Sequence, residues 1–271
     1  MAAASQEFQV QSKWDVNLYE KGRPRYTRES VEYLLKQLGV FDRDHAKPMT
    51  ILELGAGTGL FTRGILKTLD DHYITNTRVI ASDPLESMCD LFKQLLPEVK
   101  MLHCVAEKID LADESVDVVI SAQAFHYFAN NQALAEIHRV LVPRGRFGVI
   151  WNSRDFSVPW VCEIQAVIDP YFKSANTPNN LDNKWKRLLE SSSLFGTLHG
   201  SDDHLHNSQE GTEDDIVCAI MCMSAISQCS EREKKNIEAR IRRILNDNPE
   251  LKGLTHYKLP YITPLYWCEK Q

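Results

Sequence analysis

The sequence predicts an α/β fold in which helices cover both faces of a doubly wound, mostly parallel sheet. Short apolar segments alternate with helix-like segments between residues 50 and 151, and this alternation is typical of parallel sheets. A turn with three alternating glycines follows the first apolar segment. The chain has 271 residues, of which 43% are hydrophobic, so it is long enough to bury the core of one large domain.

The elements of this regular part follow from local composition. The expected strands are short apolar segments, often rich in β-branched residues, at 50–54, 78–82, 100–104, 116–121 and 146–151. The expected helices repeat apolar residues at helical spacing and cover 29–39, 59–69, 85–96 and 131–141. Gly39 ends the first of these helices, and Pro143 and Gly145 follow the last.

The alternation stops after residue 152. Helices are expected there at 158–170, 181–194, 212–229 and 231–246, and strands at about 197–206 and 261–268. We expect these late strands to join the sheet at one edge and the helices to form a cap over the strand ends. The predicted organisation is therefore one domain over 1–271, with an N-terminal lid or helix (1–45), a cofactor-binding core (46–152), and cap helices with edge strands (153–271).

Composition excludes several classes of partner. The formal net charge is −6, which does not favour nucleic acid or an anionic membrane surface. No apolar segment of signal-peptide type occurs in residues 1–13, and no run of about 18 apolar residues occurs anywhere. The seven cysteines are odd in number and form no CxxC pair, so we expect reduced thiols, no metal site and a cytoplasmic protein. We expect a monomer or a weak homodimer.

The glycine turn, ELGAGTG at 53–59, indicates a ligand that approaches the backbone closely. Two ligand classes fit: a dinucleotide and S-adenosylmethionine. A dinucleotide fingerprint needs GxGxxG, but Leu60 stands where the third glycine is required. Glu53 would also repel a pyrophosphate, whereas it would attract the ammonium and sulfonium of S-adenosylmethionine.

Asp83 follows the second expected strand. A carboxylate at this place can accept hydrogen bonds from both hydroxyls of a ribose, but NAD enzymes use the same device, so Asp83 does not separate the two ligands. It could equally cap the next helix. Its position at the strand end still predicts a place in the ligand site.

Further segments bring a resemblance to a known family. They are Ala106–Glu107 after the third strand, Gln123–Ala124–Phe125–His126 after the fourth, and the ExGxGxG turn itself. With these the chain resembles the class I S-adenosylmethionine-dependent methyltransferases, type 11 group, from about Thr50 to Trp151. The segment Tyr19–Tyr26 (YEKGRPRY) and the IWNSRD sequence at the fifth strand are similar to the trans-aconitate-methyltransferase-like branch, although Thr27 replaces that branch's usual proline.

The resemblance implies a Rossmann-like, seven-stranded sheet and a set of site residues. It assigns the methionine end of the cofactor to Glu53, Gly55, Ala56, Gly57 and Thr58, and the ribose to Asp83. The adenine would lie near Pro84, Met88, Ala106 and Glu107, with Gln123 also lining the cofactor. Glu107 could equally be a solvated loop charge, and His126 a packed side chain between Phe125 and Tyr127.

The acceptor is expected to be a small molecule. The [ND]PPY element of amide and exocyclic-amine methylation is missing, because residues 121–124 read Ser–Ala–Gln–Ala. A phenol, thiol or amine acceptor would benefit from a base such as His126. If the branch resemblance holds, the acceptor is a carboxylate, for which arginine clamps suffice. The expected substrate-binding residues are Tyr19, Arg23, Arg25, Tyr26, Trp151 and Arg154.

Two other functions stay open from the sequence. One is an NAD(P)-dependent oxidoreductase, which the missing third glycine and Glu53 disfavour. The other is a non-catalytic methyltransferase-fold binding protein. The complete set of cofactor residues disfavours this second alternative, but the sequence offers no check on the acceptor side.

Overall fold

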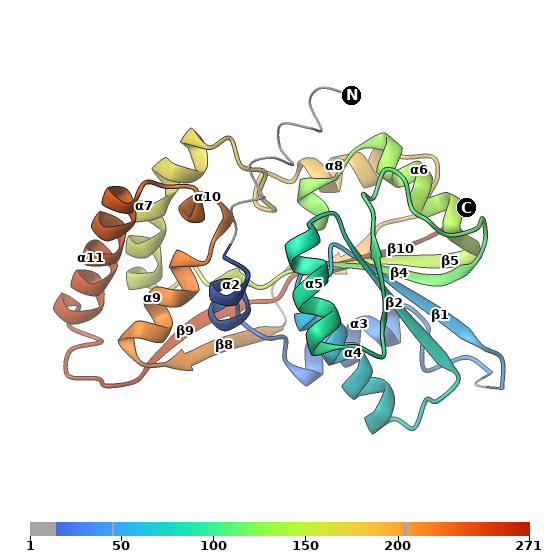
Figure 1. Cartoon of the computed structure of the whole chain (residues 1–271), viewed down its shortest axis with the longest axis horizontal. Coiled ribbons are helices and arrows are strands. Elements are labelled where there is room, and N and C mark those ends of the chain that lie inside the picture. Colours follow the sequence, from blue (N-terminus) through green and yellow to red (C-terminus); the bar gives the residue numbers. More distant parts are fainter. Residues whose placement is uncertain (1–14, 45, 203–204) are drawn as a thin grey trace. The chain divides into compact units, whose positions relative to one another are not determined.

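The computed structural model describes residues 15–44, 46–202 and 205–271. The first fourteen residues of the expected lid therefore lie outside the described residues. The chain forms two compact units (Figure 1). The larger unit consists of Tyr26–Asn152, Pro178–Leu205 and Thr263–Gln271, and the smaller unit takes the segments up to Arg25, Ser153–Thr177 and His206–Ile262.

The larger unit is built on a seven-stranded sheet with the order β3-β2-β1-β4-β5-β10-β7. Its strands are β1 (Met49–Leu54), β2 (Thr77–Asp83), β3 (Lys100–His103), β4 (Val116–Ala122), β5 (Leu141–Ile150), β7 (His199–Ser201) and β10 (Leu265–Glu269). The first five strands are parallel, and β10 runs antiparallel to both β5 and β7. The order reverses between β1 and β4, so the doubly wound prediction is confirmed.

Helices cover both faces of this sheet (Figure 1). They are α3 (Arg28–Gln37), α4 (Leu60–Asp71), α5 (Glu86–Leu95), α6 (Asn131–Val140) and α8 (Lys184–Ser191), together with the 3₁₀ turn η1 (Phe125–Tyr127). Side chains alternate between the faces along each strand. Ile51 of β1 packs with the α3 and α4 side, whereas the next residue, Leu52, packs with the α6 and α8 side.

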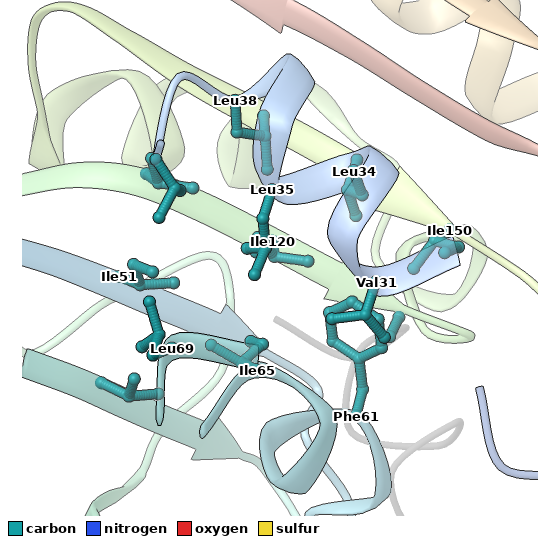
Figure 2. Packing of buried hydrophobic residues seen from close by; sticks show 14 of the residues in the cluster. Val31, Leu34, Leu35, Leu38, Ile51, Phe61, Ile65, Leu69, Ile120 and Ile150 are labelled. Carbon is teal, nitrogen blue, oxygen red and sulfur yellow. The ribbon is translucent and has the colours of Figure 1, made fainter. Parts of the chain in front are cut away.

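Figure 2 shows the first of these two layers, in which side chains of α3 and α4 meet the sheet. Leu34 and Leu35 of α3, Ile65 of α4 and Ile120 of β4 belong to one cluster of this layer, and all four are fully buried. Full burial of such a side chain contributes about 1.5–3 kcal/mol. This packing fixes β1 and α4, and therefore the glycine turn between them.

The smaller unit has its own three-stranded antiparallel sheet, β6-β9-β8. Its elements are α2 (Val16–Gly22), β6 (Ser153–Arg154), α7 (Pro159–Ser174), β8 (His206–Gly211), α9 (Glu213–Met221), α10 (Ser224–Ser227), α11 (Glu231–Asp247) and β9 (Tyr257–Ile262). Its separate core includes Trp160, Ile220, Ile241 and Leu259. None of the helices in the described part of the chain combines the length and apolarity needed to cross a membrane.

Three late elements differ from expectation. The segment 197–206 is divided between β7 of the large sheet and the start of β8 in the small one, and 261–268 is divided likewise between β9 and β10. Thr263 marks the second division, where its N–H donates to the carbonyl of Leu205. The expected helix 212–229 is interrupted because Met223 adopts an extended backbone (ψ 146°) between α9 and α10.

Candidate functional site

The glycine turn between β1 and α4 is held by the end of β2. Gly55, Gly57 and Gly59 have φ values of 72°, 57° and 86°, a conformation that glycine adopts without strain. The N–H groups of Gly55 and Ala56 both donate to the carbonyl of Ser82 at 2.9 Å. These amides are therefore already bonded within the protein, which does not suit the binding of a pyrophosphate.

Glu53 lies one residue before the end of β1 and is only 1% exposed. Its Oε2 accepts a hydrogen bond from the hydroxyl of Thr62 on α4 at 2.5 Å. Burial raises the pKa of Glu53 to about 8, and the nearby Asp83 also raises it. The carboxyl group is thus mostly protonated at neutral pH in the unliganded protein, and an adjacent cation would favour its ionised form.

Asp83 ends β2 and connects the glycine turn to the next helix. Its Oδ2 accepts from the N–H of Gly57 and its Oδ1 from that of Leu85, both at 2.9 Å. Burial raises the pKa of Asp83 to about 6, while these two backbone hydrogen bonds oppose the rise. Asp83 therefore shapes the turn, and the two carboxyls of the turn make the site suitable for a cation rather than an anion.

Thr58 supplies an orphaned polar group in the same turn. Its side chain is fully buried, and Oγ1 has no hydrogen-bond partner among the described residues.

The residues expected near an adenine follow β2 and β3. Met88 is buried on α5, Ala106 is buried after β3, and Pro84 is partly exposed. Glu107 accepts a hydrogen bond from Nδ2 of Asn130, which caps α6, at 2.7 Å. Glu107 thus has a structural partner, and its contact with a cofactor stays a prediction.

Gln123 turns the chain after β4 in a left-handed conformation with φ 58°. Its N–H donates to the carbonyl of Ile150, and its side-chain amide donates to the carbonyl of Asn152, both at 2.8 Å. A non-glycine residue at positive φ is uncommon, and such strain is often found at functional sites. These bonds fix the ends of β4 and β5 relative to each other.

His126 and Trp151 are brought together within the larger unit. The indole Nε1–H of Trp151 donates to Nδ1 of His126 at 3.1 Å. Trp151 is fully buried and packs against Trp185, with ring centroids 4.5 Å apart. His126 is partly exposed, so it is neither an ordinary core residue nor a surface residue.

The expected substrate-binding residues are divided between the two units. Tyr26 belongs to the larger unit, where its ring packs edge-on against Phe61. Tyr19, Arg23, Arg25 and Arg154 belong to the smaller unit. Arg25 is largely exposed and forms an ion pair with Glu20 at 3.2 Å.

Arg154 of β6 is an arginine whose guanidinium is buried within the smaller unit. Its Nη1 donates to Sδ of Met223 at 3.2 Å and its Nη2 to Oε1 of Gln165 at 2.5 Å. Its Nε is buried and has no hydrogen-bond partner in the part of the chain that the structure describes. Burial lowers the pKa of the Arg154 guanidinium, and the charge of Arg23 lowers it further.

Arg23 and Tyr261 complete this cluster. We call Arg23 and Arg154 the arginine pair. The Arg23 guanidinium lies over the ring of Tyr19, 5.4 Å from its centroid. Burial raises the pKa of Tyr261 to about 12, although both arginines oppose the rise. The charges of Arg23 and Arg154 thus both act on the buried phenol of Tyr261.

Sequence reasoning missed Thr62, Gln165 and Tyr261. Thr62 lies nine residues from Glu53, on the buried side of α4, and helical spacing offers a weak signal for it. Gln165 and Tyr261 lie on α7 and β9 and come together with Arg154 only through tertiary packing, so no local pattern indicates them. No cluster of three or more potential metal ligands occurs among residues 15–44, 46–202 and 205–271.

Comparisons with known proteins agree with this geometry. The Methyltransferase domain family matches residues 52–149. An uncharacterized methyltransferase-like protein of Schizosaccharomyces pombe, C25B8.10, is 33% identical over 259 residues, which is 96% of this chain and 95% of that protein. The malonyl-[acyl-carrier protein] O-methyltransferase of Methylococcus capsulatus is 36% identical over 103 residues, 36% of each chain.

A solved structure assigned to the type II methyltransferases, from Anaeromyxobacter dehalogenans, has the same fold. The TM-score is 0.62 at 22% identity, and the match covers 92% of this chain and 97% of that one. At this level of identity the likeness concerns the fold alone.

Proposed function

This chain belongs to the class I S-adenosylmethionine-dependent methyltransferases, and on that premise we propose that it methylates a carboxylate oxygen of a small acceptor molecule. Family membership decides between the two ligand classes of the glycine turn in favour of S-adenosylmethionine over a dinucleotide. The trans-aconitate-like branch stays a prediction, as do the individual roles of the site residues.

The residues of the turn fit the cationic methionine end of this cofactor. Glu53 would face its positive charges, the glycines at 55 and 57 would admit it close to the backbone, and Asp83 would take the ribose. The buried hydroxyl of Thr58 lacks a partner among the described residues. When bound, S-adenosylmethionine supplies a methyl group that passes to the acceptor oxygen as the carbon–sulfur bond breaks, its electron pair remaining on sulfur.

The observation that carries the choice of a carboxylate is the buried Nε of Arg154. A buried guanidinium is costly unless each of its N–H groups finds an acceptor. Gln165 and Met223 satisfy two positions, and the Nε position has no acceptor in the described structure. A carboxylate accepts paired N–H groups from arginine, so it would complete this site.

Two further observations support the proposal. Arg23 acts on Arg154 as a like charge, and an anion would relieve the repulsion between them. The relative from Methylococcus capsulatus, which matches 36% of this chain, is by name a malonyl-[acyl-carrier protein] O-methyltransferase. A carboxylate is ionised at neutral pH, so it is a nucleophile that needs orientation rather than deprotonation.

The test uses purified full-length protein, S-adenosylmethionine labelled with tritium in the methyl group, and a panel of mono-, di- and tricarboxylic acids. A methyl ester releases volatile labelled methanol in alkali, whereas N-, S- and C-methyl products do not. We expect base-labile product with at least one acid. Products that are all stable to alkali, or no product with any acid, would contradict carboxylate methylation.

Arginine variants test the proposed anion site. Arg154→Lys keeps the charge but loses the planar fork of donors, and Arg23→Met removes the second cation. Each change is expected to raise KM for the acid by at least 30-fold, corresponding to roughly 2 kcal/mol or more. The control is Arg243→Met, because Arg243 of the same unit is exposed and paired with Asp247. If Arg154→Lys and Arg23→Met have the same KM for the acid as the natural protein and the Arg243→Met control, these two arginines do not bind the acceptor.

A further inference from the structure

The loop between β3 and β4, residues 104–115, is tied to α6 at several points. At the start of α6, the side-chain amide of Asn130 donates to Oε1 of Glu107 at 2.7 Å. Further along α6, Oε2 of Glu136 accepts a hydrogen bond from the N–H of Ile109 at 2.9 Å. Side chains of a neighbouring helix therefore help to set the path of this loop.

Arg139 of α6 binds the same loop through five hydrogen bonds, which is the number of N–H groups that a guanidinium carries. Its Nη2 donates to the carbonyl of Ile109 at 2.8 Å and its Nη1 to that of Leu111 at 2.9 Å. Nη1 also donates to Asp113 at 2.7 Å, while Nε and Nη2 donate to the carboxylate of Glu136 at 2.7 and 2.8 Å. A lysine has three donors on a single nitrogen, so it cannot reproduce this set.

The start of the loop contains a buried backbone donor. Ala106 is 8% exposed, and its N–H has no hydrogen-bond acceptor among the described residues. Buried backbone N–H groups are almost always bonded. The N–H of Ala106 therefore indicates an acceptor atom that a ligand supplies.

The order of the strands indicates which part of the cofactor supplies this atom. Strands β1, β2 and β3 are adjacent and parallel, so their carboxyl ends follow one another along one edge of the sheet. With the methionine end at the turn after β1 and the ribose at Asp83 after β2, as proposed above, the adenine reaches the loop after β3. N1 is the ring nitrogen of adenine that lies farthest from the ribose, and it is an acceptor.

We propose that Arg139 and Glu136 are positioning residues, which hold the loop so that the N–H of Ala106 donates to N1 of the adenine. The clamp acts on the backbone on the far side of Ala106 from β3, and β3 itself holds the near side. This inference rests on the proposed placement of the cofactor, but it does not depend on the choice of a carboxylate acceptor.

The test is calorimetry of full-length protein with S-adenosylhomocysteine and with its 1-deaza analogue, in which a C–H group replaces N1. The natural protein is expected to bind S-adenosylhomocysteine at least about 10-fold more tightly than the analogue, because the analogue leaves the buried N–H without an acceptor. In Arg139→Lys we expect this preference to fall to about threefold or less. The control is Arg78→Lys, because Arg78 is exposed on β2 of the same sheet, and its preference should equal that of the natural protein.

The ratio of the two affinities separates positioning from a general loss of stability. Partial unfolding reduces the binding of both ligands by the same factor and leaves the ratio unchanged. If Arg139→Lys is unfolded in urea denaturation, Glu136→Gln replaces it, since glutamine keeps the shape of the side chain but directs an N–H group at one of its donors. This variant should reduce the preference at least twofold.

Three results would overturn the inference. Equal affinity of the natural protein for both ligands would mean that the N–H of Ala106 does not meet N1. An undiminished preference in the folded Arg139→Lys or Glu136→Gln variant would show that the loop keeps its place without the clamp. If the natural protein binds no S-adenosylhomocysteine at all, the placement of the cofactor fails and the inference fails with it.

The carboxylate proposal fails by a different result. An acid panel without any methyl ester contradicts the choice of acceptor, whereas the calorimetric ratio involves no acceptor and still decides the role of Arg139.

Discussion

Glu53 shows how far a single residue can be understood from sequence. Its place before the glycines predicts a carboxylate near a cation, and that prediction needs only the ExGxGxG spacing. Its burial and its bond to Thr62 depend on how α4 packs on β1, and no local pattern contains that information. The raised pKa of about 8 is therefore a property of the fold.

This raised pKa predicts a stability change with pH. The unfolded chain releases the Glu53 proton near pH 4.5, whereas the folded unliganded protein keeps it to about pH 8. Between these values the folded state binds more protons, so the free energy of unfolding falls as pH rises, by up to about 1.4 kcal/mol per pH unit. Urea denaturation at pH 6.5 and 8 should show a drop of about 1–2 kcal/mol from this group.

Glu53→Gln should abolish most of that drop, because glutamine does not titrate. The pH window lies above the pKa of Asp83, about 6, so Asp83 contributes little there. Glu98→Gln is the control, since Glu98 is exposed in the loop before β3. A drop of the same size in Glu53→Gln and in the control would show that Glu53 is not the responsible group.

The arginines mark the limit of sequence reasoning at the residue scale. The segment from Tyr19 to Tyr26 suggests that Arg23 and Arg25 act together. In the structure the charge of Arg23 acts on Arg154, and Arg25 forms an ion pair with Glu20. Tyr26 joins the core of the other unit. Residues adjacent in sequence thus separate because the unit boundary passes between Arg25 and Tyr26.

At the scale of elements, the strands of the regular part were predictable because each is a short apolar run. The structure has β1, β2, β3 and β4 within about two residues of the expected ranges. Strand β5 begins five residues earlier than expected, at Leu141, because its first part pairs with β4 across a register shift. Strands β8 and β9 could not be assigned to a second sheet from sequence, because that pairing joins segments some 50 residues apart.

The turn between β1 and α4 gives a prediction at this scale. A Cβ added to Gly55 would lie 2.5 Å from Cβ of Ala124, and φ is 72°. Gly253 has a similar φ of 83° but nothing within 4 Å of its added Cβ. Gly253→Ala should therefore cost only the left-handed strain, about 1–2 kcal/mol, while Gly55→Ala should cost clearly more.

Urea denaturation measures the loss of folding stability in both variants, and calorimetry measures their affinity for S-adenosylhomocysteine. We expect Gly55→Ala to weaken this binding at least tenfold, because Ala124 and the turn must move apart, and Gly253→Ala to leave it unchanged. Equal costs and unchanged binding in both variants would mean that close packing against Ala124 is unimportant.

At the scale of the whole molecule, each unit is assembled from three separate segments of the chain. The sequence shows a change of rhythm after residue 152, which marks one of the boundaries. It does not show that 178–205 and 263–271 return to the larger unit, because these segments are recognised only by the strands they pair with. Leu265, for example, is fully buried between β5 and β7.

We therefore predict that removal of Thr263–Gln271 abolishes cofactor binding by the larger unit. Without β10, strand β5 loses its antiparallel neighbour and β7 loses the only sheet partner described for it. We expect no S-adenosylhomocysteine binding by calorimetry and loss of amide protection in β5 by hydrogen exchange. Removal of Gln271 alone, which is exposed, is the control. Unchanged binding after the longer deletion would contradict this account.

The insertion of β10 between β5 and β7 has a consequence for biosynthesis. A ribosome exposes β1 to β5 early, but the sheet stays open at β5 until residue 269 has left the exit tunnel. Until then the edge of β5 that later pairs with β10 has unpaired backbone N–H and C=O groups, and such unpaired edges promote aggregation. The pairing of β10 with β5 is thus a late step of folding during synthesis, and a chaperone that shields this edge would bind before β10 pairs with β5.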